Sequence, residues 1–338
     1  MSISGRGLSA QPALHVLRKV ADAYAALKSY VRAGNLGSQG SKRRMRASAS
    51  PIRFRVGAAQ PFDDRCLSWQ MSAATVSIWT ISGRLKRIAF AGHPEQLDLL
   101  ARYRRGESDL LCQNGAWYLI ATCEVPEVEE NSRPDGFVGV DVGIVNIAAT
   151  STGRRHSGRR LNRECEHDRK LRCRLQQKGT KSAKRRAKRL AGRQARRTRD
   201  INHKISKCIV AEAQRTGRGI ALEDLTGIRE RVRLKKPQRV TLHSWAFRQL
   251  GQFIVYKARR AGVPVVYVDP AHTSQECSRC HHIDKRNRPS QAVFHCRSCG
   301  FVEHADLNAS HNIAARGWCV WARGAKSVVP SLSSRLRA

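Results

Sequence analysis

Two pairs of cysteines constrain the fold of this 338-residue chain more than any other feature. Cys277 and Cys280 form one CxxC pair, and Cys296 and Cys299 form a second pair after fifteen intervening residues. Each pair can place two thiolates on one ion through a tight turn, and the loop between the pairs can fold back as a hairpin. Four thiolates close a tetrahedron and leave no position for water. The spacing therefore predicts a structural zinc ribbon.

The cellular compartment determines whether these cysteines stay reduced and available to a metal ion. The N-terminal residues show neither the continuous apolar core nor the small-residue cleavage pattern of a signal peptide. We expect a cytoplasmic, nucleoid-associated protein whose thiols stay reduced, and disulfides, the alternative use of the cysteines, require an oxidising compartment. The sequence has no run of about 18 apolar residues, which argues against a membrane protein.

The charge balance predicts a polyanionic partner. The chain has 63 Lys and Arg against 26 Asp and Glu, a formal net charge of +37 at pH 7. Residues 154–204 alone hold 21 Lys or Arg and four acids. Such an excess goes beyond what solubility requires and is typical of proteins that bind the phosphates of nucleic acids. We expect basic helices over 154–204.

Hydrophobic periodicity divides the chain into a β-rich part and an α/β part. Apolar residues at helical spacing predict a helix from about 12 to 32, and an irregular basic linker follows at 34–50. Short β-rich runs within 51–130 predict a small antiparallel barrel, interrupted by a helix near 95–104. After the turn-rich residues 131–136, strands alternate with helices and predict an α/β domain.

Three acids lie at the ends of predicted strands or at the start of a predicted helix. Asp141 ends an apolar strand, Glu223 ends another with Asp224 beside it, and Asp306 precedes an amphipathic helix. Each acid alone has an ordinary role, in a turn or as a helix N-cap. Side chains alternate along a strand, so only one of Glu223 and Asp224 can face a given site. We choose Glu223 because Asp224 is better placed to cap the following turn, and the sequence leaves both open.

Taken together, the three acids predict a two-metal site. Phosphodiester hydrolysis by two Mg²⁺ ions requires hard oxygen ligands from several elements, one of them bridging ions about 4 Å apart. Asp141, Glu223 and Asp306 would be these ligands and the catalytic residues. The sequence contains no P-loop, dinucleotide fingerprint or Ser-His-Asp order that competes for the active site.

The order of the motifs resembles the TnpB family, the RuvC-like proteins encoded by insertion sequences and often labelled OrfB-type transposases. These proteins are similar to the compact type V CRISPR effectors. The segments GVDVGI, ALEDLTGI and HADLNASHNIA, with the cysteine pairs between the second and third, carry the resemblance. It covers about residues 137–317 closely.

The resemblance implies an RNA-guided DNA endonuclease, encoded by or derived from a transposable element. Its RuvC-like acidic triad falls on Asp141, Glu223 and Asp306, with two catalytic Mg²⁺ ions, one structural Zn²⁺, a guide RNA and a DNA target. The implied fold is multidomain α+β. It comprises an N-terminal helix and β-barrel wedge domain, then an RNase H-like (RuvC) α/β domain with the four-cysteine zinc ribbon inserted.

The resemblance also sets the expected domain boundaries. They are a shortened helical recognition segment and basic linker at 1–50, a β-rich wedge-like domain at 51–130, a nuclease domain at 137–270 with its basic helices, the zinc ribbon at 271–303, a final helix carrying the third acid at 304–318, and a disordered tail at 319–338.

Other functions remain open at this point. A catalytically weak or inactive guided DNA-binding protein predicts a damaged triad, whereas all three acids are present. A transposase proper would use a similar acidic site and differ in its products. A plain zinc-ribbon RNA-binding module gives no account of Asp141 and Glu223. Trp245 and Tyr256 are expected in the core rather than stacked on bases.

Overall fold

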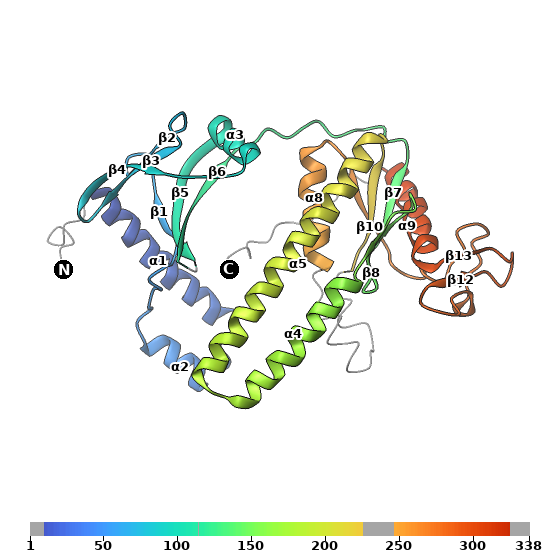
Figure 1. Ribbon diagram of the computed structural model, residues 1–338, viewed down its shortest axis with the longest axis horizontal. Coiled ribbons are helices and arrows are strands. Elements are labelled where there is room, and N and C mark those ends of the chain that lie inside the picture. Colours follow the sequence, from blue (N-terminus) through green and yellow to red (C-terminus); the bar gives the residue numbers. More distant parts are fainter. Residues whose placement is uncertain (1–9, 114, 226–246, 325–338) are drawn as a thin grey trace. The chain divides into compact units, whose positions relative to one another are not determined.

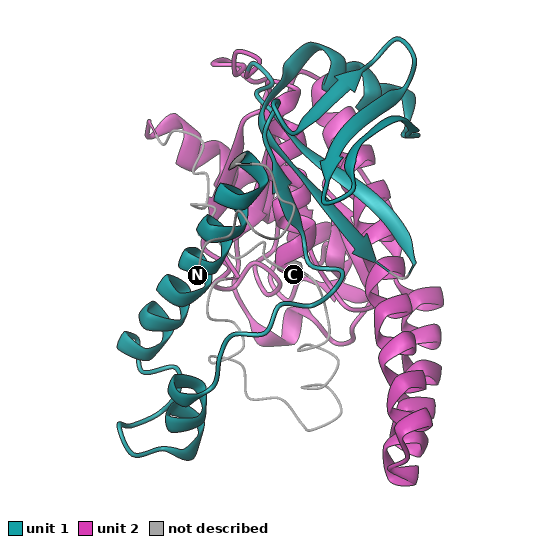
Figure 2. Cartoon of the chain, turned by 90° about the vertical axis from the view of Figure 1, so that its left-hand side faces the viewer, with its two compact units in different colours: residues 1–126 teal, residues 127–338 magenta. Residues whose placement is uncertain are grey.

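The computed structural model describes residues 10–113, 115–225 and 247–324 (Figure 1). The chain divides into two compact units, residues 1–126 and residues 127–338 (Figure 2). No helix within the described ranges is long and apolar enough to cross a bilayer. The mixed α and β character expected from the sequence is confirmed.

Two helices precede the strands of the first unit. Helix α1 (Ala10–Arg32) confirms the helix expected from periodicity. The basic stretch after it was predicted to be irregular, and this is wrong for α2 (Lys42–Ala49). The side-chain oxygen of Ser41, its N-cap, accepts a 3.3 Å hydrogen bond from the backbone N–H of Arg44. Such a cap satisfies a free N–H of the first turn, so this short helix forms without a buried face.

The strands of the first unit form two antiparallel sheets. One sheet has the order β1 (Gln60–Phe62), β5 (Arg104–Gln113), β6 (Ala116–Cys123), and the other β2 (Leu67–Gln70), β3 (Thr75–Thr80), β4 (Gly83–Ala89). Leu67 and Val76 from one sheet share an apolar cluster with Leu110 and Leu119 from the other. Helix α3 (Pro94–Tyr103) confirms the predicted helix. A barrel closed around this cluster stays a prediction.

A five-stranded sheet forms the centre of the second unit. Its order is β11–β10–β7–β8–β9, with the bounds β7 (Phe137–Asp141), β8 (Asn146–Thr150), β9 (Arg155–Ser157), β10 (Gly219–Glu223) and β11 (Val265–Val268). Within this sheet, β7, β8 and β9 follow each other in the chain and pair antiparallel, whereas β10 and β11 run parallel to β7. Parallel neighbours require crossover connections, and helices supply them here.

Helices cover both faces of this sheet. Helices α5 (Lys181–Arg215) and α8 (Phe247–Arg260) lie on one face, and α9 (Ala305–Ala322) lies on the other (Figure 1). Alternation along the strands explains the arrangement. Val138 and Val140 join the apolar cluster of α5 and α8, while Phe137 joins the cluster that contains Ile313 of α9.

Helix α9 approaches the sheet very closely. A Cβ atom on Gly139 of β7 would collide with the carbonyl oxygen of Ser310 and lie 2.5 Å from the backbone nitrogen of Ala314. A Cβ atom on Gly317 would lie 2.5 Å from the Cβ of Ala221. Glycine at these two positions lets the middle of α9 pack directly on β7 and β10.

The last helix is longer than expected from the sequence. It ends at Ala322, so the prediction of a helix that stops at 318 and a tail from 319 is wrong for its first residues. Trp321 explains the extension, because its ring packs on Phe137 with 5.9 Å between the ring centroids. Residues 325–338 lie outside the described part of the chain.

Helix α4 (Arg159–Lys178) and α5 form an antiparallel hairpin (Figure 1). Its seam is apolar, with Leu171, Leu175, Ala183, Ala187 and Leu190. The basic helices expected over 154–204 are therefore present, although residues 155–157 form the edge strand β9. Lys and Arg side chains line the outer faces of this hairpin.

Candidate metal centre and acidic site

The two CxxC pairs meet in a small ribbon with a hairpin, β12 (Val293–His295) and β13 (Val302–His304), and the short 3-10 helix Lys285–Asn287. Its four sulfur atoms all lie within 4.8 Å of one another. The Sγ atoms of Cys277 and Cys299 are 3.7 Å apart, and those of Cys280 and Cys296 are 3.5 Å apart. Zinc–sulfur bonds of about 2.3 Å in a tetrahedron place the sulfurs about 3.8 Å apart. The quartet is compatible with a zinc site.

The thiols differ in how readily they ionise. Burial raises the pKa of Cys296, but hydrogen bonds from the backbone N–H groups of Cys299 and Ser298 outweigh it and lower that pKa to about 6. Burial raises the pKa of Cys277 to about 12. The thiolate form is thus favoured at Cys296 and disfavoured at Cys277, and a bound metal ion would favour the thiolate form of all four.

Asp141 and Glu223 end adjacent parallel strands at the same level. Val140 of β7 pairs with Leu222 of β10, so the next residue of each strand lies about one strand spacing, roughly 4.8 Å, from the other. Gly139, two residues before Asp141, touches α9. Because side chains two residues apart share a face, both carboxylates point to the face that α9 covers.

Asp306 lies in the first turn of α9 and is 6% exposed. It does not cap the helix, because His304 does: the ring Nδ1 of His304 accepts a 3.2 Å hydrogen bond from the backbone N–H of Asp306. The carboxylate of Asp306 instead accepts a 2.8 Å hydrogen bond from the Asn146 side chain and a 3.4 Å hydrogen bond from Arg288. Asn146 begins β8, so these contacts connect α9 to the sheet.

The three carboxylates interact electrostatically. Burial raises the pKa of Asp141, the charges of Glu223 and Asp306 raise it as well, and Arg288 opposes them, which leaves it at about 8. Burial also raises the pKa of Glu223, against a hydrogen bond from Thr273 and the charge of a nearby arginine. Carboxylates crowded in this way favour a cation, and their hard oxygens are ligands that Mg²⁺ prefers.

The three acids differ from the cysteine quartet in their compactness as a ligand group. Among residues 10–113, 115–225 and 247–324, the quartet is the one group of three or more His, Cys, Asp or Glu residues whose ligand atoms lie close enough together to hold a metal ion. The acids therefore share one electrostatic environment without forming a cage for a single ion.

Asp224 faces the other side of the sheet. It is exposed, and together with burial its charge raises the pKa of Tyr267 to about 12. Tyr267 pairs in register with Leu222, whose side chain lies in the cluster of α5 and α8. Alternation therefore places Glu223, and not Asp224, on the side of Asp141 and Asp306.

Four side chains at the site were not predicted. They are Asn146, Thr273, Arg288 and Arg316. Three of them come from loops or strand starts, and no local pattern marked them. A signal was available for Arg316, because it ends a row of polar residues spaced four apart on the face of α9.

Tyr256 of α8 is exposed, so its assignment to the core is wrong. Among its described side chains, α8 buries Leu250, Ile254, Val255 and Ala258. Tyr256 lies edge-on to Phe253 with 5.9 Å between ring centroids. Trp245 lies outside the described residues.

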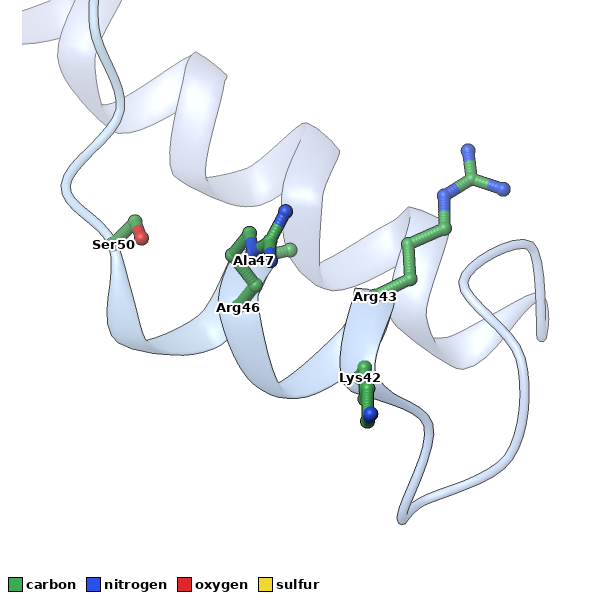
Figure 3. Close-up of a pocket in the computed structure, with 5 residues that line it drawn as sticks. All are labelled: Lys42, Arg43, Arg46, Ala47 and Ser50. Atoms are coloured by element: carbon green, nitrogen blue, oxygen red, sulfur yellow. The ribbon is translucent and has the colours of Figure 1, made fainter.

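A pocket of different character lies in the first unit. Lys42, Arg43, Arg46, Ala47 and Ser50 of α2 and its C-cap line it (Figure 3). Its lining includes three cations and none of the three acids, so it is not part of the acidic site. A phosphate group is the ligand that such a lining suits.

Two protein families match consecutive parts of the chain. Residues 121–226 match a family described as "Probable transposase", OrfB of IS605 type, and residues 247–313 match the "Cas12f1-like, TNB domain". A solved complex of Cas12f1 with guide RNA and target DNA has a similar fold, with a TM-score of 0.51 at 20% identity. That match covers 66% of this chain and 48% of the other.

Curated relatives match over shorter spans. The CRISPR-associated endodeoxyribonuclease Cas12f1 of Sulfoacidibacillus thermotolerans is 46% identical over 114 residues, covering 33% of this chain and 26% of the relative. The Cas12f1 of Syntrophomonas palmitatica is 32% identical over 227 residues, covering 61% and 44%. A TnpB-like protein of Methanocaldococcus jannaschii is 40% identical over 124 residues, covering 36% and 44%.

The chain thus spans less than half the length of each of these relatives. The two family matches follow each other in the order of the motifs and enclose the three acids and four cysteines. The predicted resemblance to the TnpB family is confirmed, since the chain is similar to the OrfB family of IS605 type over residues 121–226 and to a TnpB-like protein.

Proposed function

We propose that this chain is an RNA-guided DNA endonuclease that hydrolyses phosphodiester bonds at Asp141, Glu223 and Asp306. One observation carries the proposal: three acids from β7, β10 and α9 converge on one buried place on the α9 side of the sheet. The strand order supports an RNase H-like, RuvC-like domain, since three antiparallel strands are followed by two parallel ones beside the first. Relatives named as an endodeoxyribonuclease and as a putative RNA-guided DNA endonuclease support guided cleavage of DNA.

Two Mg²⁺ ions at this place would activate the attacking water and stabilise the leaving oxygen. Asp141, Glu223 and Asp306 would hold these ions, and Asp141 interacts electrostatically with both other acids. Arg288 and Asn146 hold Asp306 in its orientation.

Nucleic acid would bind through the basic surfaces. The α4–α5 hairpin and the pocket of α2 offer cations to phosphates, which supplies affinity without sequence preference. Base pairing between a guide RNA and the target would supply most of the specificity. The β-rich first unit would act as a wedge-like domain, and one Zn²⁺ would stabilise the ribbon.

The test begins with the purified protein and any RNA that copurifies with it. The RNA is sequenced, and the complex is incubated with matching DNA and Mg²⁺. Wild-type protein should cut the DNA, and Asp141→Ala should not. A wild type that never cuts, or an Asp141→Ala variant that cuts equally well, would show that the proposal is wrong.

A transposase proper is the second candidate, and the match to a family described as "Probable transposase" favours testing it. The same acidic site could serve strand transfer. The DNA products separate the two functions, because a guided endonuclease leaves free cut ends and a transposase joins them to a second DNA.

A further inference from the structure

A buried hydroxyl contacts the acidic site from the segment between β11 and the first cysteine pair. Thr273 is 4% exposed, and its Oγ1 donates a 2.5 Å hydrogen bond to Oε1 of Glu223. The carbonyl oxygen of Pro270 is a second acceptor at 3.1 Å. A hydroxyl has one proton, and the nearer, more negative acceptor takes it. The bond occupies Oε1 and leaves Oε2 of Glu223 for another ligand.

Two asparagines of α9 hold the backbone around this threonine. Asn312 is 3% exposed, and its side-chain amide donates to the carbonyl of Thr273 at 2.9 Å and to that of Glu276 at 2.7 Å. Asn308 is fully buried and donates to the same Glu276 carbonyl at 2.8 Å. Buried amides with satisfied donors are costly to displace. The position of the Thr273 backbone is therefore set by α9.

Arg316 extends this row by one more helical turn. Its guanidinium donates to the carbonyls of Asp269 at 2.8 Å and Ala271 at 2.6 Å, and to the carboxylate of Glu276 at 2.6 Å. Its positive charge also acts on Glu223. Asn308, Asn312 and Arg316 lie four residues apart, so one face of α9 binds the whole segment that leads into the ribbon.

We propose that Thr273 is a positioning residue for Glu223. Its hydroxyl holds one carboxylate oxygen, so that Glu223 presents the other oxygen to a metal ion in one fixed direction, and Asn312 holds Thr273 in place. This inference rests on the proposed function, because it assigns Thr273 a role at the same acidic site. It also gives α9 a second task, since the helix that carries Asp306 orients Glu223 as well.

Binding of Mn²⁺ to the full-length chain, freed of RNA, tests the proposal through the electron paramagnetic resonance signal of the free ion. Thr273→Val keeps nearly the same volume and removes the hydroxyl. It should weaken Mn²⁺ binding about 10- to 100-fold, which is the usual effect of removing a residue that orients a metal ligand. The Mg²⁺ concentration for half-maximal cleavage should rise by a similar factor. Zinc content should not change. Wild-type affinity in Thr273→Val would overturn the proposal.

Two further substitutions isolate the hydroxyl even if the valine variant loses stability. Thr273→Ser and Thr273→Ala both remove the γ-methyl group, and they differ only by the hydroxyl group. The serine variant should bind Mn²⁺ more tightly than the alanine variant by a factor of about ten or more. Equal affinities in the two would contradict the positioning role.

A matched control removes a buried hydroxyl of α9 that does not contact Glu223. The Ser310 hydroxyl donates to the carbonyl of Leu307 in its own helix at 2.7 Å, so Ser310→Ala should leave Mn²⁺ affinity unchanged. Asp141→Ala tests the proposed function separately. If it binds Mn²⁺ and cuts DNA like the wild type, the acidic site itself is wrongly assigned. If it loses both while Thr273→Val keeps both, only the role of Thr273 fails.

Discussion

The side-chain amide of Asn146 donates a 2.8 Å hydrogen bond to the carboxylate of Asp306, and 160 positions separate the two residues in the sequence. Asn146 begins β8, directly after the loop that follows Asp141, whereas Asp306 lies in the first turn of α9. The bond therefore connects the helix carrying one acid to the sheet carrying the other two. It is one of the contacts that bring the three separated acids close together.

Substitution of Asn146 should impair cleavage more than stability. Asn146→Ala should slow DNA cleavage about tenfold, because Asp306 loses a donor that orients it. Asn146→Asp should slow cleavage further, since a fourth carboxylate would repel Asp306. Single-turnover cleavage rates on matched DNA measure both effects, with zinc content as the check on folding. An Asn146→Asp variant that cuts at the wild-type rate would contradict the assigned contact.

The raised pKa of Asp141 predicts a pH dependence of stability without magnesium. An ordinary Asp has a pKa of 3.8 and Asp141 has one of about 8, so between these values the folded chain keeps a proton that the unfolded chain releases. The stabilisation is fully present below about pH 4 and is lost as the pH rises through about 8. Relative to Asp141→Asn, the wild type should melt at progressively lower temperature over this range.

Thermal unfolding in magnesium-free buffer without a chelator measures this difference, because a chelator would also remove zinc. Added Mg²⁺ should restore the melting temperature of the wild type at high pH and leave Asp141→Asn unchanged. If the melting temperatures of the wild type and of Asp141→Asn change with pH by the same amount, Asp141 does not titrate as described.

Gly139 should tolerate no side chain. Gly139→Ala should destabilise the second unit by about 3 kcal/mol or more, because backbone atoms of α9 occupy the space of the new methyl group. Gly192→Ala is the matched control in the same unit: its methyl group meets only the end of the Arg196 side chain, at 3.5 Å. Alanine in a helix interior should stabilise by about 0.5–1 kcal/mol. Urea unfolding followed by circular dichroism compares the two variants.

Loss of the zinc site should disable the acids as well as the ribbon. Cys296→Ala should lose zinc and lower the folded yield, because metal binding contributes to folding. Cleavage should fall too, since Arg288, which contacts Asp306, lies in the ribbon. Cys319→Ser is the control, as this exposed thiol lies outside the quartet. Metal analysis and thermal unfolding report the outcome; a Cys296→Ala protein with full zinc content would refute the site.

The basic hairpin should bind nucleic acid through phosphates. Arg185, Arg186 and Arg189 are exposed on α5, so replacing all three with alanine should leave the melting temperature nearly unchanged. RNA affinity should fall, and the slope of log K against log salt should become less steep by about 0.9 for each lost contact with duplex phosphates. Filter binding at several salt concentrations measures the slope. An unchanged slope would place the nucleic acid elsewhere.

Local patterns in the sequence were sufficient for several features. The spacing of Cys277, Cys280, Cys296 and Cys299 predicted one metal centre, because each CxxC pair is a local turn that needs no knowledge of the rest of the fold. Apolar periodicity predicted α1 and α3 and the strands that end in Asp141 and Glu223. It failed for α2, where the Ser41 cap rather than a buried face supports the helix.

The tertiary structure alone decided which acid joins the site and what surrounds it. The alternation of side chains along a strand places Glu223 and Asp224 on opposite faces of the sheet. Only the register of β10 against β7 and the position of α9 show that Glu223 is the one on the face of Asp141. His304 caps α9 and leaves the carboxylate of Asp306 for the sheet.

The contacts of Asn146, Thr273 and Arg288 join residues far apart in the sequence. The sequence by itself therefore determined the cysteine quartet and the three acids as local motifs. The assembly of the acids into one site depended on packing between distant elements, because such contacts arise from the paths of strands and helices in space and leave no periodic signal along the chain.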